Sequence, residues 1–447
     1  MPYPCVIRMN TYTFLKMKKT IICIAIGLLA LVSCQKQVKV TDPITIQSPT
    51  PTEQITKVSL TETEKGYMKA GNAMAFRFLD KMYEGTNLIV SPLSLQYALA
   101  MTANGASGET LQEIVDFLGY GEDGIEALNA YCKKLIEELP AVDLNVSLKL
   151  TDAILANDQF PLLPAFKQTV ESNYYAAVES MPFTNPDYTA ARINEWASRS
   201  TNGFIDKVLE PSELSPDAVA YIMNALYFKA KWAGSDYDPM FSEHSAWEEE
   251  FTLSDGTKKK MDMLHTVEYF RYAVRDGYKL VAIPYANYKY FMYILLPDGN
   301  DVKPLLEKLR ATPWGEITGG LLNDAEVHLR FPKFSIENKL YLKEALEAMG
   351  VQKAFGRGAS FDRMFEPRPG WYYWIEKVIQ KAKIDVTEWG TEAAAVTIVE
   401  MVAESAMPIE DLPKRIDFIA DHPFVYVIGE ATSGAILFEG VYSGKEK

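Results

Sequence analysis

The sequence predicts an α+β fold that follows an N-terminal targeting segment. From about residue 60, helical patterns fill the first third of the chain and strand patterns its latter half, an order typical of the α+β class. No Pro- or Gly-rich linker divides the chain after that point. With 447 residues the chain exceeds the size at which one core usually stops growing, so one large domain with appendages and two domains are both allowed.

Three helices are predicted early in the chain. Residues 72–82 are apolar at helical spacing. A second helix is expected to begin at Ser91-Pro92, because the first helical turn tolerates proline. A third helix is expected from Gly108, where Gly108-Glu-Thr-Leu-Gln-Glu-Ile continues the helical pattern.

The strands are predicted from apolar runs further along the chain. Residues 221–229 and 290–297 indicate buried strands. Asp255-Gly256 is a hairpin turn signal. Glu248–Glu250 and Lys258–Lys260 are expected to face each other across that hairpin as solvated charge pairs.

Composition argues against several classes of function. The net charge of −14 disfavours binding to a phosphate backbone and mainly implies solubility. The chain has no GxSxG, HExxH, Walker or GxGxxG motif, and its four histidines are not spaced as metal ligands. Asp324 and Glu326 carry no pattern that marks an acid–base pair. An unrelated envelope hydrolase stays open as an alternative, since a catalytic triad is defined by geometry.

The N-terminus is predicted to be a lipoprotein signal peptide over residues 1–33. A lysine-rich start precedes an apolar run too short for a membrane span, and Leu31-Val-Ser-Cys34 resembles the bacterial lipobox. Cys34 would then carry lipid; the alternative is an ordinary secretory signal with an incidental cysteine. Residues 34–59 are Thr/Pro-rich and predict an extended tether, followed by the folded body at 60–447. Cys132 is then the one cysteine of the body, expected to be an inert apolar side chain.

The segment Gly390–Pro408 has neither Gly nor Pro between its ends and reads with period two. Its charges, Glu392, Glu400 and Glu404, share one parity, whereas the other parity is uncharged and begins with small residues. This pattern predicts a long strand that could lie with one face against a packed surface. The alternative is a polar-ended loop whose alternation arises by chance.

At this point the sequence resembles a known family. Gly390-Thr-Glu-Ala-Ala-Ala resembles the hinge of the serpins, the large serine-protease inhibitors, and the resemblance extends over essentially all of residues 60–447. The other motifs that carry it are Asn87–Ser94 (shutter segment), Thr201–Ile205, Asn224–Trp232 (a central strand with the breach tryptophan), Phe331–Ile336, Met349–Phe355, Asp421–Val427 and Ala435–Gly440.

The resemblance implies three β-sheets, about nine helices and an exposed C-terminal reactive loop. It also implies a suicide-type inhibitor: a serine, or also a cysteine, protease attacks the loop and forms a covalent acyl complex, and the cut loop inserts into the main sheet of a metastable chain. A monomer without catalytic residues, cofactor, metal or nucleic-acid partner is expected. A non-inhibitory serpin, acting as chaperone, carrier or protease substrate, is the alternative.

The resemblance also assigns site residues. Spacing from Gly390 places the reactive bond at Glu404-Ser405, with nearby alternatives at Met401, Val402 and Ala403. The small apolar residues before the bond favour an elastase-like target, although Glu404 suits a glutamate-preferring protease, and subtilisin-like and cysteine proteases stay open. The implied hinge is Gly390, Thr391, Glu392, Ala393, Ala394 and Ala395, and the implied shutter and breach residues are Ser91, Ser94, Asn224, Trp232 and Gln380.

Two positions depart from the family pattern. Trp389 stands where the family usually has a second acidic residue, and Gln380 aligns with a shutter histidine that many members carry. Gln380 can still hydrogen-bond to Ser91 or Asn224, so no titrating group is expected at that position. By analogy, Gln35 after the lipidated cysteine indicates a bacterial outer-membrane lipoprotein, on the periplasmic or the exposed side.

Overall fold

The computed structural model describes residues 42–120, 124–235, 238–242, 244–391 and 414–446. The chain divides into two units, Met1–Thr41 and Asp42–Lys447, and the described residues all belong to the second. The predicted signal peptide, Cys34 and tether residues 34–41 therefore lie outside the described residues, and the domain boundaries stay predictions.

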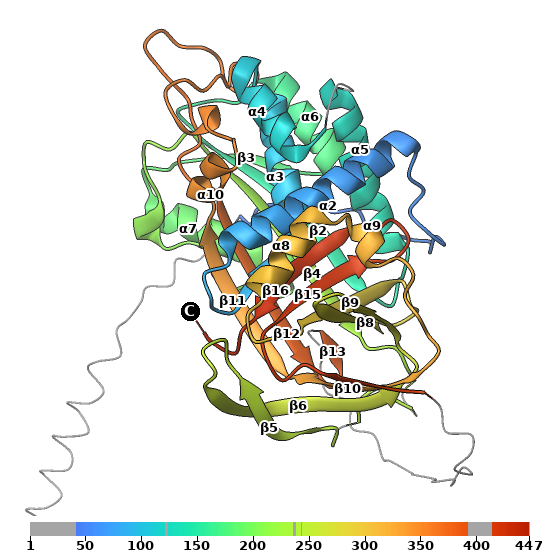
Figure 1. The fold of residues 1–447 in the computed structure, drawn as a ribbon. Helices are drawn as coiled ribbons and strands as arrows, with labels where there is room; N and C mark the ends of the chain where they lie inside the picture. The colour runs from blue at the N-terminus through green and yellow to red at the C-terminus, as the bar shows by residue number, and fades with distance from the viewer. Residues whose placement is uncertain (1–41, 121–123, 236–237, 243, 392–413, 447) are drawn as a thin grey trace, which may run out of the picture. The chain divides into compact units, whose positions relative to one another are not determined.

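The described residues form nine α-helices and three β-sheets, which confirms the predicted α+β class and architecture (Figure 1). Most helices fall in the first half of the chain. They are α2 (Glu62–Met82), α3 (Pro92–Gly105), α4 (Gly108–Leu118), α5 (Gly124–Glu138), α6 (Pro164–Tyr174), α7 (Pro186–Ser200), α8 (Lys303–Ala311), α9 (Trp314–Ile317) and α10 (Lys343–Ala348).

The main sheet has six strands and contains the predicted hinge. Its order is β11 (Phe334–Tyr341), β12 (Ile379–Thr387), β13 (Gly390–Thr391), β4 (Ala220–Lys231), β2 (Ser147–Asn157) and β3 (Ala177–Met181). A second six-stranded sheet has the order β1 (Leu88–Val90), β16 (Ile436–Tyr442), β15 (Phe424–Glu430), β9 (Tyr290–Pro297), β8 (Tyr278–Pro284) and β7 (Arg271–Arg275). The third sheet has the order β14 (Arg415–Ile419), β10 (Glu326–Pro332), β6 (Lys258–Glu268) and β5 (Ala246–Thr252).

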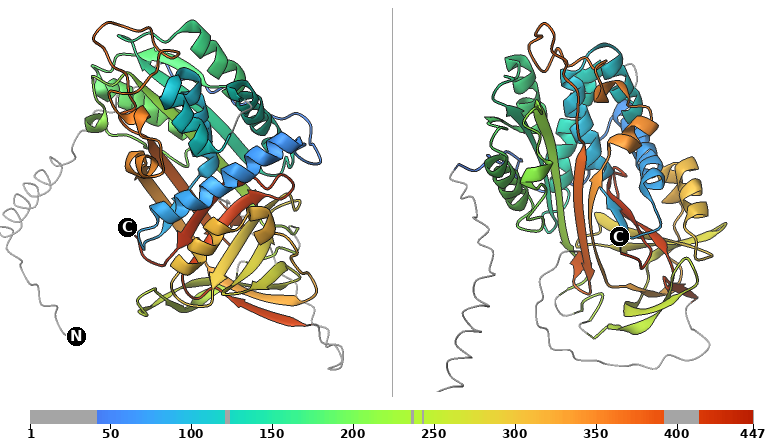
Figure 2. Two further views of the ribbon diagram at one scale, coloured as in Figure 1. Left: turned by 45° about the horizontal axis from the view of Figure 1, so that its top comes forward. Right: turned by 90° about the vertical axis from the view of Figure 1, so that its left-hand side faces the viewer.

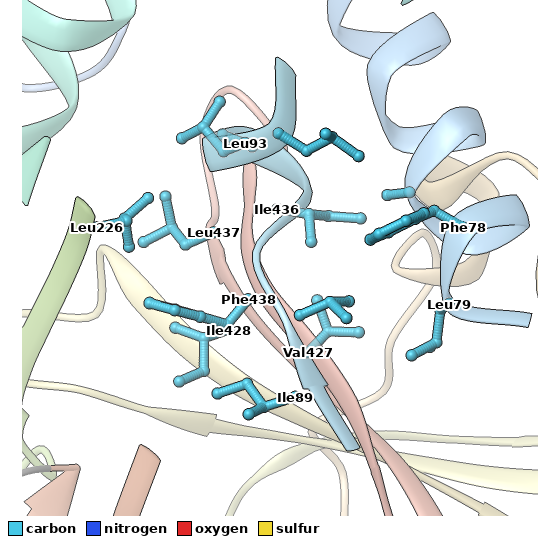
Figure 3. Packing of buried hydrophobic residues seen from close by; sticks show 14 of the residues in the cluster. Phe78, Leu79, Ile89, Leu93, Leu226, Val427, Ile428, Ile436, Leu437 and Phe438 are labelled. Atoms are coloured by element: carbon cyan, nitrogen blue, oxygen red, sulfur yellow. The ribbon is translucent and has the colours of Figure 1, made fainter. Parts of the chain in front are cut away.

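The core lies where the second sheet meets the helices and the main sheet. Side chains from α2, α3, β1, β4, β15 and β16 gather in one buried cluster (Figure 3). Because most of β9, β15 and β16 is inaccessible to water on both faces, these strands read as continuous apolar runs rather than alternating ones. Figure 2 shows two further views of the body, in which the long strands of the main sheet run beside one another.

The early helices form as predicted, with one difference in length. The helix expected at residues 72–82 begins ten residues earlier, at Glu62, because Thr61 and Glu64 form a capping box there. Ser91 accepts a hydrogen bond from the Ser94 amide as N-cap of α3, and Pro92 occupies the first turn. The Asp255-Gly256 hairpin joins β5 to β6, and Lys258–Glu250 and Lys260–Glu248 pair across it at 2.7 Å.

The segment at residues 42–59 packs against the body, although its sequence showed no core-forming pattern. Ile44 is fully buried beside Ile193 and Trp196 of α7. Arg199 Nη1 donates to the Ile44 carbonyl at 3.1 Å, and Arg192 forms an ion pair with Asp42 at 3.3 Å. Ile44 and Ile46 are too few, among prolines and threonines, to form a periodic apolar pattern, so the sequence could not indicate this contact.

Candidate functional site

The predicted hinge enters the main sheet as a short strand between two long ones. Gly390 and Thr391 of β13 lie opposite Thr387 and Val386 of β12 on one side. On the other side they lie opposite Lys231 and Ala230 of β4. The long strand predicted after Gly390 is therefore present in its first two residues, and its continuation lies outside the described residues.

Gly390 can be replaced by no other residue without a clash. Its φ is 137°, a conformation that L side chains rarely adopt. A Cβ at this position would lie 2.1 Å from the Ala230 carbonyl oxygen and 2.8 Å from Lys231 Cα. Backbone atoms cannot yield as a side-chain tip can, so the close approach of two strands fixes this glycine.

Thr391 points toward the core of the molecule. It is 3% exposed, and its hydroxyl lies 2.5 Å from the Tyr285 hydroxyl. Burial raises the pKa of Tyr285 far above its ordinary value, so the phenol stays protonated and can donate. Residues of the same parity that follow Thr391 would therefore face inward if the strand continued.

Beyond β13, no described strand pairs with the facing edges of β4 and β12. The other edge of β4 pairs with β2 from Ala220 to Lys229, and the far edge of β12 pairs with β11 along its length. Among the described residues, only Gly390 and Thr391 pair with both β4 and β12. We call the space between Ala220–Lys229 and Ile379–Asp385 the slot. Its edges carry backbone groups that a further strand could satisfy.

A cavity lies on each face of the sheet at the slot. The inner one has a volume of about 50 Å³ and is bounded by α3, the start of β4 and residues 374–378. Apolar side chains dominate its wall, among them Leu99, Ile222 and Val378. The outer cavity lies between α7 and the slot and has a similar volume, with Trp196, Tyr221 and Lys377 in its wall.

The predicted shutter residues on β12 and α3 meet. Gln380 Oε1 accepts a hydrogen bond from the Ser91 amide at 3.0 Å, and Gln380 Nε2 donates to the Ser91 carbonyl at 2.8 Å. The Ser91 hydroxyl in turn donates to the Leu437 carbonyl at 2.8 Å. All three hydrogen bonds are buried, so this pair ties β12 firmly to the start of α3.

A second chain of hydrogen bonds ties β4 to the same turn of α3. Ser94 donates through its hydroxyl to Asn224 Oδ1. Asn224 Nδ2 donates to Asp152 Oδ1 on β2 at 2.7 Å. Asp152 did not emerge from the sequence analysis, and an acidic residue directly before the apolar run Ala153–Ala156 is the signal that could have found it.

The predicted breach tryptophan closes the hinge end of the slot. Trp232 stacks on Tyr285 with ring centroids 4.6 Å apart and an interplanar angle of 9°. Its Nε1 donates to the Thr387 carbonyl at 2.8 Å. The Trp389 carbonyl accepts from the Trp232 amide at 3.3 Å, and Glu388 pairs with Lys333 at 2.6 Å, so the turn before Gly390 is held on both sides.

The remaining predicted loop residues fall in 392–413 and lie outside the described residues. They are Glu392, Ala393, Ala394, Ala395, Met401, Val402, Ala403, Glu404 and Ser405. The described residues resume at Lys414, whose ammonium lies 2.8 Å from the Tyr272 hydroxyl and 3.2 Å from the Asp324 carboxylate. Asp324 thus anchors the segment that precedes β14.

Other kinds of site find no support in the part of the chain that the structure describes. No group of three His, Cys, Asp or Glu residues there could hold a metal ion, and no helix there is long and apolar enough to cross a membrane. Cys132 is buried, and burial raises the pKa of its thiol well above the ordinary value, as suits an inert side chain.

A sequence profile of the serpin (serine protease inhibitor) family matches residues 69–444. The chain belongs to the serpin family. "Serine protease inhibitor 42Dd" of Drosophila melanogaster is 31% identical to this serpin over 370 residues, 82% of this chain and 93% of that protein. The family assignment leaves an unrelated envelope hydrolase without support.

Solved structures agree with the assignment. The thermophilic serpin Tengpin in its native state superposes with a TM-score of 0.76 at 28% identity, over 88% of this chain and 96% of that one. Thyroxine-binding globulin in complex with thyroxine superposes with a TM-score of 0.71 at 23% identity, over 85% and 100% of the two chains. At that identity the second likeness shows the fold alone.

Proposed function

We propose that this serpin inhibits serine proteases as a suicide substrate, by inserting its cut reactive loop into the slot. The observation that carries the proposal is β13, which starts a strand between β4 and β12; beyond it, no described residue pairs with their facing edges. A target protease would attack near Glu404-Ser405 and form an acyl-enzyme, and the freed segment would then extend β13.

The register of β13 specifies where each loop residue would go. Thr391 lies opposite Ala230 of β4 and Val386 of β12, and both pairings are antiparallel. Six residues further along the loop, Thr397 would therefore come opposite Asn224 and Gln380, each six residues earlier in its strand. Thr397 would thus reach the shutter, where both neighbours carry amides able to bond its hydroxyl.

The inner face of the slot suits the uncharged parity of the loop. In the same register, Val399 would come opposite Ile222 and Val378, both in the wall of the inner cavity. Small residues at Ala393 and Ala395 would pass the crowded hinge without desolvating a polar group. The glutamates would face outward.

The free energy released when the cut loop enters the slot supports an irreversible insertion step. About a dozen new backbone hydrogen bonds, each worth roughly 0.5–1.5 kcal/mol net, together with buried Val399 and Met401, would release on the order of 10 kcal/mol. That gain must be unavailable before cleavage, so the intact chain would be metastable.

Incubation with an elastase-like protease tests the proposal. We expect a covalent complex that survives boiling in detergent, and mass spectrometry of the released peptide should place the cut between Met401 and Ser405. Complete cleavage without a complex would instead assign the chain to the non-inhibitory members, as a carrier, chaperone or plain substrate. An elastase-like target is proposed from the small apolar residues at Met401–Ala403.

We also propose that lipid on Cys34 anchors this serpin to a bacterial outer membrane, where it would guard the envelope against proteases. The support is the lipobox-like Leu31–Cys34 and the tether that follows. Metabolic labelling with a fatty acid tests this, with Cys34→Ala as the control that should take up no label.

A further inference from the structure

The first turn of α3 anchors both edges of the slot. Ser91 binds Gln380 and so holds β12, while Ser94 binds Asn224 and so holds β4. β4 moves with β2, because the two strands share a long ladder. Widening the slot therefore requires at least one of these two ties to α3 to break.

Asp152 on β2 supports the hydrogen bond between Ser94 and Asn224 by binding the other end of the Asn224 amide. Its carboxyl is 2% exposed and accepts from Asn224 Nδ2, which leaves Asn224 Oδ1 free to accept from Ser94. The second oxygen, Oδ2, is buried without a hydrogen-bond partner. A buried carboxylate with one bond is poorly compensated when it is ionised.

The groups packed around Asp152 do not offset its charge. From α3 it faces Ser94 and the buried Tyr97 hydroxyl, which also lacks a partner; from α5 it faces Cys132, with Tyr174 of α6 behind. Burial raises the pKa values of Tyr97, Cys132 and Tyr174 well above their ordinary values, so these groups stay neutral. Among the described residues, no lysine, arginine or histidine forms an ion pair with Asp152.

We propose that Asp152 is a positioning residue that makes slot opening dependent on pH, so that the main sheet accepts a strand more readily below neutral pH. The inference rests on the proposed loop insertion, and it adds that the rate of insertion depends on pH. Gln380 supplies no titrating group on β12, whereas Asp152 on β2 supplies one to the same hydrogen-bond network.

The two protonation states differ in how strongly they hold Asn224. An ionised Asp152 makes a charge-assisted bond to Nδ2 and polarises the amide, so that Oδ1 binds Ser94 more strongly. A protonated Asp152 makes only a neutral bond, and the tie loosens. Burial raises the pKa of Asp152 to about 7, against the opposing effect of the Asn224 bond, so both states are populated near neutrality.

The rate of spontaneous conversion to a loop-inserted form tests the inference. The whole folded chain is held at a moderately elevated temperature between pH 5.5 and 8.5, and the converted form is followed by its higher melting temperature. We expect conversion to be about three- to tenfold faster at pH 5.5 than at pH 8.5, with a midpoint near neutrality. Asp152→Asn should make the rate independent of pH, whereas Gln replacement of each of the four histidines should leave the profile in place.

A spectroscopic readout keeps the test decisive if Asp152→Asn folds poorly. The infrared band of a buried protonated carboxyl should titrate near neutrality in the wild type and in Glu439→Gln, which removes a buried carboxyl whose two oxygens both lack a hydrogen-bond partner. Absence of that titration, or a pH-dependent rate that survives in Asp152→Asn, overturns the role of Asp152 and leaves loop insertion standing. If no converted form arises at any pH and cleavage of the loop does not raise the melting temperature, the proposed function fails, and this inference fails with it.

Discussion

At the scale of single residues, the hinge depends on two side chains that tolerate little change. Gly390 lies against the backbone of β4, where a Cβ has no room. Thr391 is small enough to enter the sheet and polar enough to bond Tyr285. Together they set both the starting point and the face of any strand that follows.

Thr391→Arg should turn this serpin from an inhibitor into a substrate. Because Thr391 lies buried beside Tyr285, a guanidinium here should force β13 out of the sheet in the intact chain. Its entry during insertion would then cost several kcal/mol of desolvation. Insertion should therefore become slower than release of the cut loop, and the moles of serpin consumed per protease should rise at least tenfold. Thr391→Ser keeps the hydroxyl and is the control. Unchanged stoichiometry in the arginine variant would contradict the prediction.

Glu439 on β16 makes the stability of the fold depend on pH. Both of its carboxyl oxygens are buried without a partner, and burial raises its pKa well above the ordinary value. Above the pKa of the unfolded chain, the unfolded state loses its proton while the folded state retains it. Stability therefore falls with rising pH, by about 1.4 kcal/mol for each pH unit until the folded group ionises.

Glu439→Gln should remove that slope. We expect its melting temperature to exceed that of the wild type at pH 7.5 by more than it does at pH 4.5. Glu430→Gln is the matched control, because Glu430 is also buried but accepts hydrogen bonds from Thr432 and Ser433. Equal differences at both pH values would show that Glu439 does not bind an extra proton.

The sequence could predict Gly390, Thr391, Ser91, Ser94, Asn224, Trp232 and Gln380 as site residues, because each stands in a recognisable motif. The structure brings them to the hinge and shutter of one sheet. Asp152 and Tyr285 could not be predicted in the same way. Their importance comes from partners on other elements, and no local pattern encodes a contact between β2 and β4 or between β8 and the hinge.

At the scale of elements, the register of β13 predicts a cross-strand ion pair in the inserted form. Glu400 would lie opposite Lys377 of the β12 segment, on the outer face below α7. Lys377→Glu should therefore place two like charges together. Since such pairs are worth about 0.2–1 kcal/mol, the stoichiometry of inhibition should rise up to about fivefold.

The reversed pair Glu400→Lys with Lys377→Glu should recover the wild-type stoichiometry. Lys383→Glu supplies the control, because in the same register it lies opposite the uncharged Ala394. If Lys377→Glu and Lys383→Glu act alike, the effect is one of net charge and the register is wrong.

Elements with strong local signals were predictable, and those built from distant parts were not. The hairpin at Asp255-Gly256 and the helix from Pro92 follow from turn and capping residues within a few positions. The order of strands in the main sheet places β13 between β12 and β4, which lie far apart in the chain. Periodicity within one strand carries no information on its neighbours, so the slot itself could not be read from the sequence.

At the scale of the whole molecule, the proposed function depends on a free-energy difference between the intact and the cut chain. In the described part of the chain, the facing edges of β4 and β12 have no strand partner beyond Thr391. The segment proposed to fill them is held at its two ends by the hinge and by Lys414. Cutting between Met401 and Ser405 frees one end. The cut segment can then extend β13 without dragging β14 out of its sheet.

Cleavage of the loop should therefore make the molecule more stable, the opposite of the usual effect of a broken chain. From a gain on the order of 10 kcal/mol, we expect the melting temperature to rise by about 10 °C or more after a single cut. The measurement is differential scanning calorimetry on intact and nicked samples, with the cut position verified by mass spectrometry. Nicked Thr391→Arg is the control, because its hinge should block entry to the slot and leave the melting temperature near that of the intact form. If the nicked wild type melts where the intact protein does, no stored energy is available to trap a protease, and inhibition by insertion is ruled out for this serpin.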